Sequence, residues 1–468
     1  MAGEGDSEVL TDRVGLVGVL ALLVGNAISI PIFVLPGPLA GDAGPAVILA
    51  ALLAAVPATL TVLFNAQFGS AMPVAGGLYV YITRLTAPFW GFCVPFTLPI
   101  VTWAGLLFAA IGFAEYARFF VDVPTAPLIY VFLLFVLFVN LLGIKTVVKA
   151  QVILVIGLVA SLALFIIPGA VHVDPNHYTP MFPEGGVPVA VAVVALVFPF
   201  LGFGLLTELG EEIENPGKTI PLALFSGIAI VTAVYLALIA VLVGVMPWYD
   251  LGGTEAAVAE AGTIFLPGPL AGVVAFGAFF AVLTSVNMTL LVGSRTVMRA
   301  GRDGILPPVL SRIHPRFNTP YVSILVLGAP PLLFAAFIQE EVVELSVFIG
   351  LTVFTAIFFS AIALWNLPVE YPEHYQNATL QFRRRRGLLL AVVSAMSISA
   401  ILWIVTLIEL PVAGLLLLSW FLLGYLVYRY MIWRRGDRRR ELFVEMVTLD
   451  DHEQAFAERQ TYDDLEED

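Results

Sequence analysis

The sequence is poor in charge and in cysteine. Only 12% of its 468 residues are charged, whereas 60% are hydrophobic, and the mean hydropathy is +0.96. So apolar a chain cannot bury its hydrophobic residues in one water-soluble core. The single cysteine, Cys93, excludes an internal disulfide and any cysteine-based metal or redox motif. There is also no phosphate-binding glycine loop, zinc spacing or nucleophile elbow, so we expect no enzyme.

Long apolar runs recur along almost the whole chain. A membrane helix needs about 20 apolar residues to cross roughly 30 Å of hydrocarbon, and these runs reach that length without β-type alternation. Hydropathy therefore predicts an all-α polytopic membrane protein with about 12 transmembrane helices rather than a barrel. The predicted spans are 14–37, 44–68, 90–115, 124–143, 148–169, 188–209, 220–246, 266–298, 321–338, 342–366, 388–408 and 411–432.

The basic residues are unevenly distributed between the predicted loops. With the N-terminus inside, 21 of the 22 lie in cytoplasmic segments, and Arg118 alone lies outside. Short cytoplasmic loops of membrane proteins carry such an excess of Lys and Arg. We therefore predict a multi-pass plasma-membrane protein with both termini in the cytoplasm. Residues 1–13 form the N-terminal tail and 433–468 an acidic C-terminal tail.

Two predicted spans contain residues that interrupt a helix. In LVGNAISIPIFVLPG (23–37), Gly25 lowers helix propensity, and Pro31 removes a backbone donor and clashes with the preceding turn. The sixth span has a matching segment, ALVFPFLGFGLLTELG (195–210), with one proline and three glycines. Broken spans at matching places are typical of transporters with inverted repeats and a substrate site at the membrane midplane. Kinks or close packing are the alternative, since Gly and Pro are common in membrane helices.

Four stretches resemble the amino acid-polyamine-organocation (APC) transporter superfamily. They are IFVLPGPLAG…TAPFWGF (32–92), NLLGIKTVVKAQ (140–151), PFLGFGLLTELGEEIENPGKTIPLAL (199–224) and GSRTVMRAGRDGILPP (293–308). The resemblance implies a leucine-transporter-like fold, with one inverted repeat of five spans at 14–170, a second at 188–366 and two extra spans at 388–432. It also implies transport of amino acids or related amines by alternating access.

The resemblance places the substrate site at the two breaks. Where the family commonly has a Gly-Ser-Gly pattern whose amides bind a carboxylate, this chain has Ser29, Ile30 and Pro31, and proline has no N–H. A carboxylate would then depend on the Ser29 hydroxyl and on the amides of Ile30, Ile32 and Phe33. Gly204 stands where several relatives have an acidic residue, which favours a neutral, apolar solute. A packed core is the alternative interpretation of the phenylalanines. The predicted substrate-binding residues are Ala27, Ser29, Ile30, Pro31, Ile32, Phe33, Trp103, Phe198, Phe200, Gly202 and Phe203.

The residues that would couple transport to an ion are also indicated by the resemblance. Gly157 stands where some proton-coupled relatives have a lysine, whereas Thr284 and Ser285 are similar to the paired hydroxyls of sodium-coupled members. The carbonyls of a broken helix suit a hard cation. The hypothetical sodium site consists of the carbonyls of Gly25, Ile28 and Ala281 and the hydroxyls of Thr284 and Ser285. The alternative is that both hydroxyls bond back to their own helix.

The sequence thus predicts a permease that moves a neutral amino acid or a related small organic solute, with no cofactor apart from a coupling Na⁺. A sodium-independent exchanger or a proton symporter for an amine is the alternative within this class. A non-transporting nutrient sensor with the same fold is the alternative outside it. The expected partners are the small-molecule substrate and membrane lipid, with no nucleic acid.

Overall fold

The computed structural model describes residues 15–72, 77–142, 147–204, 206, 213–302, 306–314, 316–317, 319–337, 342–382 and 384–435. The predicted N-terminal tail and the part of the C-terminal tail beyond 435 lie outside these residues. All the elements assigned within them are helices.

The described helices account for the predicted spans. Nine are long and apolar enough to cross a membrane, and three shorter apolar helices, Leu16–Ala27, Ile153–Gly169 and Tyr321–Phe334, bring the set to twelve. The prediction of an all-α polytopic membrane protein is therefore confirmed. The division into repeats at 14–170 and 188–366 stays a prediction.

The bounds of the helices differ from the predicted spans by a few residues, except where a span is divided. In chain order they are α1 (Leu16–Ala27), α2 (Pro31–Val34), α3 (Pro36–Ala43), η1 (Gly44–Ala46), α4 (Val47–Ala71), α5 (Gly77–Leu85), α6 (Pro88–Arg118), α7 (Thr125–Leu142), α8 (Val147–Gly169), η2 (Pro175–Tyr178), α9 (Val187–Val197), η3 (Phe198–Gly204), α11 (Pro216–Val245), α12 (Trp248–Leu251), α13 (Ala257–Phe265), α14 (Gly268–Arg302), η5 (Pro308–Ser311), α15 (Tyr321–Gly328), α16 (Pro330–Phe334), α17 (Val342–Glu370), α18 (Pro372–Asn377), α19 (Arg385–Glu409) and α20 (Pro411–Arg435).

The first and sixth spans are broken, as the sequence predicts. Helix α1 ends at Ala27, and the chain turns through Ile28 and Ser29 before α2 starts with Pro31 at its first position. Proline is favoured there because the first helical N–H has no intrahelical partner to lose. In the sixth span, α9 ends at Val197 and the chain continues as the 3₁₀ helix η3.

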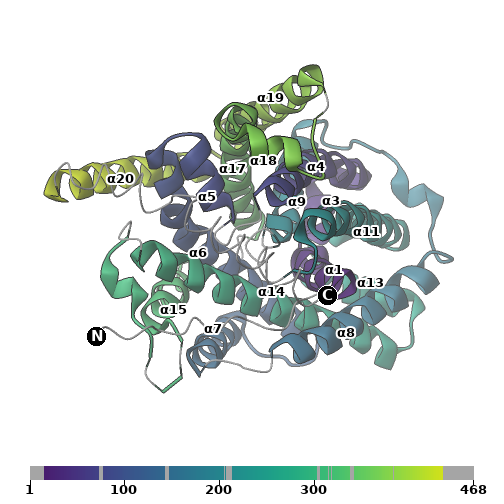
Figure 1. Ribbon diagram of the computed structural model, residues 1–468. Helices are drawn as coiled ribbons and strands as arrows, with labels where there is room; N and C mark the ends of the chain where they lie inside the picture. The colour runs from purple at the N-terminus through teal and green to yellow at the C-terminus, as the bar shows by residue number, and fades with distance from the viewer. Residues whose placement is uncertain are drawn as a thin grey trace, which may run out of the picture.

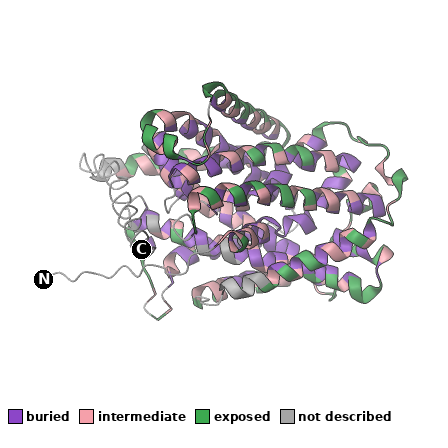
Figure 2. Cartoon of the chain, turned by 45° about the vertical axis from the view of Figure 1, so that its right-hand side comes forward, coloured by how far each residue is buried: buried purple, intermediate pink, exposed green. Residues whose placement is uncertain are grey.

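Helix α1 lies inside the bundle, where it packs against α8, α11, α14 and η3 (Figure 1). Long helices cover this centre, with α11 along α4 and α14 between α6 and α8. Helices α19 and α20 lie at the edge of the bundle (Figure 1). Only 22% and 17% of the residues in their most apolar stretches are buried within the protein. Exposed residues follow the outer faces of the helices, whereas buried residues line the interior (Figure 2). An apolar outer face is what a surrounding membrane requires.

Candidate functional site

The breaks of the first and sixth spans meet inside the bundle. The Asn26 side-chain amide donates a hydrogen bond to the Gly202 carbonyl at 3.4 Å, and Asn26 is only 8% exposed. A Cβ atom on residue 202 would lie 3.2 Å from the Ala27 nitrogen, closer than such atoms usually approach. A glycine is therefore needed at position 202, where the two backbones come together.

The break in the first span leaves donors without partners. The amides of Ile32 and Phe33 donate to the carbonyls of Ser29 and Ile30 at 3.2 and 2.9 Å. In this arrangement the two amides that were expected to bind the solute are therefore already occupied. Within the described residues, the amides of Ser29 and Ile30 and the Ser29 hydroxyl make no hydrogen bond. These three groups form the donor set of the break.

The same break also leaves acceptors. The Ile28 amide donates to the Val24 carbonyl at 2.7 Å, but no described main-chain N–H donates to the carbonyls of Gly25 or Ile28. Free carbonyls at the end of a helix carry a partial negative charge, and free amides at the start of one carry a partial positive charge. A broken helix therefore presents both signs of charge within a few residues, with no ionised side chain.

One face of α6 forms a wall beside the breaks. Phe108 contacts Phe198 edge-to-face at 5.1 Å between ring centroids, and the Tyr116 hydroxyl donates to the Phe33 carbonyl at 2.9 Å. Between them, a Cβ on Gly112 would lie 2.9 Å from a side-chain carbon of Ile30. Residues 108, 112 and 116 are spaced by four and so share one helix face. The sequence prediction did not include this face, although a glycine between two aromatic residues at helical spacing is a signal for it.

Trp103 also belongs to α6 but lies away from the breaks. Its indole N–H donates to the Val326 carbonyl at 2.9 Å, and its ring lies 5.8 Å from Phe334 and 6.0 Å from Trp420. It therefore packs between α15, α16 and α20. The structure thus places Trp103 apart from the breaks, because it lies five residues before Phe108 and therefore on a different face of α6. Its contact with a solute stays a prediction.

The phenylalanines of η3 lie on the other side of the breaks. A Cβ on Gly227 of α11 would lie 3.1 Å from the ring of Phe203, and Phe203 is fully buried. The ring of Phe200 lies 6.1 Å from that of Tyr235, also in α11. The predicted apolar lining is thus divided, with Ile30, Phe33 and Phe198 towards α6 and the other two phenylalanines towards α11. Ala27, Pro31 and Ile32 are buried within the break itself.

The hydroxyls of the hypothetical sodium site lie on α14, which packs against α1. Thr284 and Ser285 both donate to the Ala281 carbonyl, at 2.9 and 2.8 Å. The hydroxyls thus bond back to their own helix, while their oxygen lone pairs remain able to accept or to ligate. No group of three or more His, Cys, Asp or Glu in the described part of the chain could hold a metal ion.

Gly157 in α8 has no room for a longer side chain. A Cβ there would lie 2.7 Å from the ring of Phe280 in α14. A lysine at this position would therefore require a displacement of that ring.

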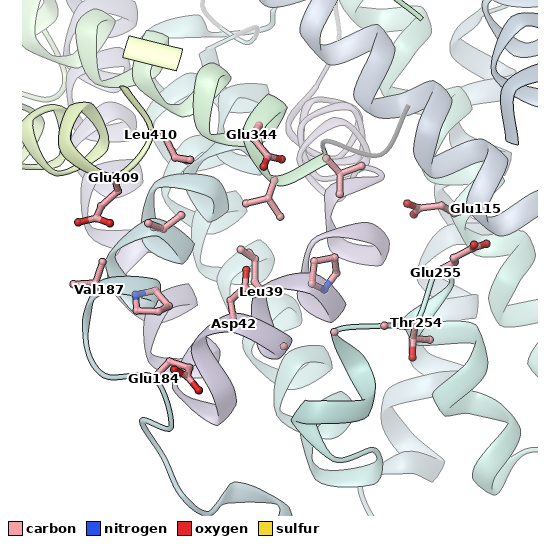
Figure 3. Close-up of a pocket in the computed structure, with 18 of the residues that line it drawn as sticks. Leu39, Asp42, Glu115, Glu184, Val187, Thr254, Glu255, Glu344, Glu409 and Leu410 are labelled. Carbon is pink, nitrogen blue, oxygen red and sulfur yellow. The ribbon is translucent and has the colours of Figure 1, made fainter. Parts of the chain in front are cut away.

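A cavity of about 1050 Å³ opens at the ends of α3 and α9 that lie away from the breaks. Figure 3 shows the side chains around it, and we call this cavity the acidic vestibule. Arg118 pairs with Glu255 at its rim. Val191 of α9 lines the cavity, so the end of α9 at Val197 lies about 9 Å further along the helix. Six carboxylates line it: Asp42, Glu115, Glu184, Glu255, Glu344 and Glu409.

A membrane bundle in which two broken spans meet below a wide cavity defines a protein of the membrane transporter class. The particular family follows from comparison with known proteins. The family model "Amino acid permease" matches residues 18–439, and the chain belongs to this family. The resemblance to the APC superfamily is thereby confirmed.

Three relatives illustrate the range of this family. A methylthioribose transporter of Bacillus subtilis is 28% identical, over 92% of this chain and 95% of its own length. A branched-chain amino acid permease, BcaP, of the same organism is 26% identical over 80% of this chain and 86% of its own. The BcaP permease of Lactococcus lactis is 29% identical over 71% of this chain and 76% of its own.

Proposed function

We propose that this permease moves neutral, apolar α-amino acids across the plasma membrane by alternating access, coupled to sodium. The observation that carries the proposal is that the break in the first span, whose free backbone groups are buried in protein, meets the 3₁₀ segment of the sixth span. Unpaired backbone groups at membrane depth are costly unless a ligand or a wet cavity satisfies them. A zwitterion fits both kinds of free group that the break offers.

The donor set suits the carboxylate of the solute. The amides of Ser29 and Ile30 and the Ser29 hydroxyl stand at the start of α2, where the helix dipole favours negative charge. The partial negative charge at the end of α1 favours the ammonium group. Both charges of an α-amino acid are thus neutralised by backbone dipoles.

The lining supports an apolar solute side chain. Residues 25–34 and 198–204 include no charged residue, and Ile30, Phe198 and Phe200 supply aliphatic and aromatic surface. An acidic side chain on the solute is further disfavoured by the carboxylates of the acidic vestibule, which repel anions. Two of the relatives are named as branched-chain amino acid permeases, which agrees with this choice.

Sodium coupling is supported by the available oxygens. One free carbonyl, that of Gly25, lies in α1, and the other, that of Ile28, lies directly after its end. The hydroxyls of Thr284 and Ser285 lie on α14, which packs against α1. A hard cation of this size takes oxygen ligands from both kinds of group. Position 157 is a glycine packed against the ring of Phe280, so no lysine ammonium is available there to couple transport to protons.

The distribution of basic residues supports one orientation of the protein in the membrane. Arg118, the basic residue on the sparse side, lies at the rim of the acidic vestibule. By the positive-inside rule, we propose that the vestibule opens to the outside and that both termini are cytoplasmic.

Uptake into proteoliposomes tests the proposal. We expect saturable uptake of leucine, isoleucine and valine, driven by an inward sodium gradient, and little uptake of glutamate or arginine. The double variant Thr284→Ala, Ser285→Ala should lose the sodium dependence. Thr296→Ala is the matched control. Thr296 lies 12 residues beyond Thr284, and its hydroxyl bonds back to the Val292 carbonyl of the same helix.

Two outcomes would contradict different parts of the proposal. Absence of saturable uptake of any neutral amino acid, under sodium or proton gradients, refutes the assigned solute. If uptake by the wild-type protein is saturable but does not depend on a sodium gradient, the proposed sodium coupling is refuted, whereas the proposed class of solute is not.

A further inference from the structure

The hydroxyl of Tyr235 is a buried polar group without a partner. Tyr235 lies in α11, is 2% exposed, and its hydroxyl makes no hydrogen bond to any of the residues that the structure describes. Two other tyrosine hydroxyls are satisfied: that of Tyr116 donates to the Phe33 carbonyl, and that of Tyr178 to the Ala240 carbonyl at 2.8 Å. Burying a hydroxyl unpaired costs free energy, so such a group in a folded protein calls for an explanation.

The position of Tyr235 connects it with the substrate site. Gly227, on the same buried stripe of α11, lies against Leu23 of α1 and Phe203 of η3. Tyr235 follows eight residues later, about 12 Å further along the helix and turned by about 80° around its axis, within the same buried stripe. Its ring lies 6.1 Å from the ring of Phe200. Tyr235 therefore stands beside the broken segment of the sixth span.

Packing alone does not explain the hydroxyl. A phenylalanine would fill almost the same space beside Phe200 and would leave no polar group unpaired, so the hydroxyl is useful only if something binds it. The carboxylate of the proposed solute needs such donors, because its two oxygens accept about four hydrogen bonds. Three donors come from Ser29 and Ile30, and the two breaks contain no cationic residue.

We propose that the Tyr235 hydroxyl donates a hydrogen bond to the carboxylate of the amino acid held between the two breaks. This inference rests on the proposed function and adds a specificity-determining residue on α11. It gives the site a donor from a helix outside the two broken spans.

The variant Tyr235→Phe tests the inference in proteoliposomes. A hydrogen bond to a charged acceptor is worth enough that its loss should raise the KM for leucine roughly tenfold or more. The KM for valine should rise by the same factor, because both solutes share the carboxylate. The thermal stability of the solute-free protein should not fall, since the substitution removes an unpaired hydroxyl.

Tyr178→Phe is the matched control. It removes a hydroxyl that bonds to the outer part of the same helix, and it lies outside the membrane spans. We expect Tyr178→Phe to leave both KM values unchanged and to lower the thermal stability of the solute-free protein. The control therefore shows the pattern of a purely structural hydroxyl.

Each contrary outcome has a distinct meaning. An unchanged KM in Tyr235→Phe, or a clear loss of stability without solute, overturns the inference. A rise in KM that differs between leucine and valine overturns the assignment to the carboxylate. If the wild-type protein itself shows no uptake of leucine and no leucine-induced rise in melting temperature, the proposed function fails, and the inference fails with it.

Discussion

The close approach of the two breaks can be tested by adding a single methyl group. In Gly202→Ala, the new Cβ would lie 2.8 Å from the Asn26 side-chain nitrogen and 3.2 Å from the Ala27 nitrogen. The Asn26 side chain can rotate away, at the expense of its hydrogen bond to residue 202. The contact with Ala27 involves backbone, so it is relieved only if α1 and η3 move apart by a few tenths of an ångström.

Forcing a methyl group into such a contact typically costs about 1–3 kcal/mol. That energy corresponds to a factor of roughly 5 to 150 in the population of the arrangement in which the breaks meet. We therefore expect Gly202→Ala to lower the melting temperature and to slow leucine uptake several-fold in proteoliposomes, with expression in the membrane retained.

Gly105→Ala provides the matched control for this substitution. Gly105 lies within α6, and a Cβ there would meet no atom within 4 Å. The same change should be neutral or stabilising, because alanine favours the helix. If Gly202→Ala melts and transports like the wild type, the breaks do not approach each other in the working protein, and the site geometry is refuted.

Three further substitutions test other contacts. Tyr116→Phe should lower the free energy of unfolding by about 1–3 kcal/mol, because the buried Phe33 carbonyl loses its donor; an unchanged thermal melt would contradict this. Gly157→Ala should lower the free energy of unfolding by about 1–3 kcal/mol, because the new methyl group would clash with the ring of Phe280. Adding Phe280→Ala should remove this clash, so strictly additive effects of the two substitutions on the free energy of unfolding would disprove the contact. Burial raises the pKa of Tyr178 above its ordinary 10.0, so the folded protein keeps a proton that the unfolded chain loses. Stability should therefore fall as the pH rises above about 10, and melts of Tyr178→Phe should show a shallower fall.

The two breaks were predictable because their causes are local. Pro31 cannot donate to the preceding turn, and the glycines of η3 weaken the helix wherever they stand. Neither effect depends on a distant residue. The same locality explains the agreement of the span bounds, since bilayer thickness alone sets how many apolar residues a span needs.

The contents of the site were less predictable. Trp103 was expected beside the breaks because it is aromatic and lies in the third span, but its indole bonds to Val326 on the opposite side of α6. Tyr235 went unnoticed, because nothing in its sequence context distinguishes a satisfied hydroxyl from an unpaired one. Both outcomes depend on which face of a helix meets which neighbour, and an almost uniformly apolar helix has no amphipathic pattern to reveal that.

By itself, the sequence determined that the chain is a membrane protein of about twelve helices, where two of those helices break, and to which family it belongs. The tertiary structure alone decided that Asn26 contacts Gly202 and that the Ile30 side chain packs against Gly112. It also decided that the amides of Ile32 and Phe33 are already occupied. The physical reason is that hydropathy and proline or glycine effects act within a few residues, whereas these contacts join segments that lie far apart in the chain and depend on how whole helices pack.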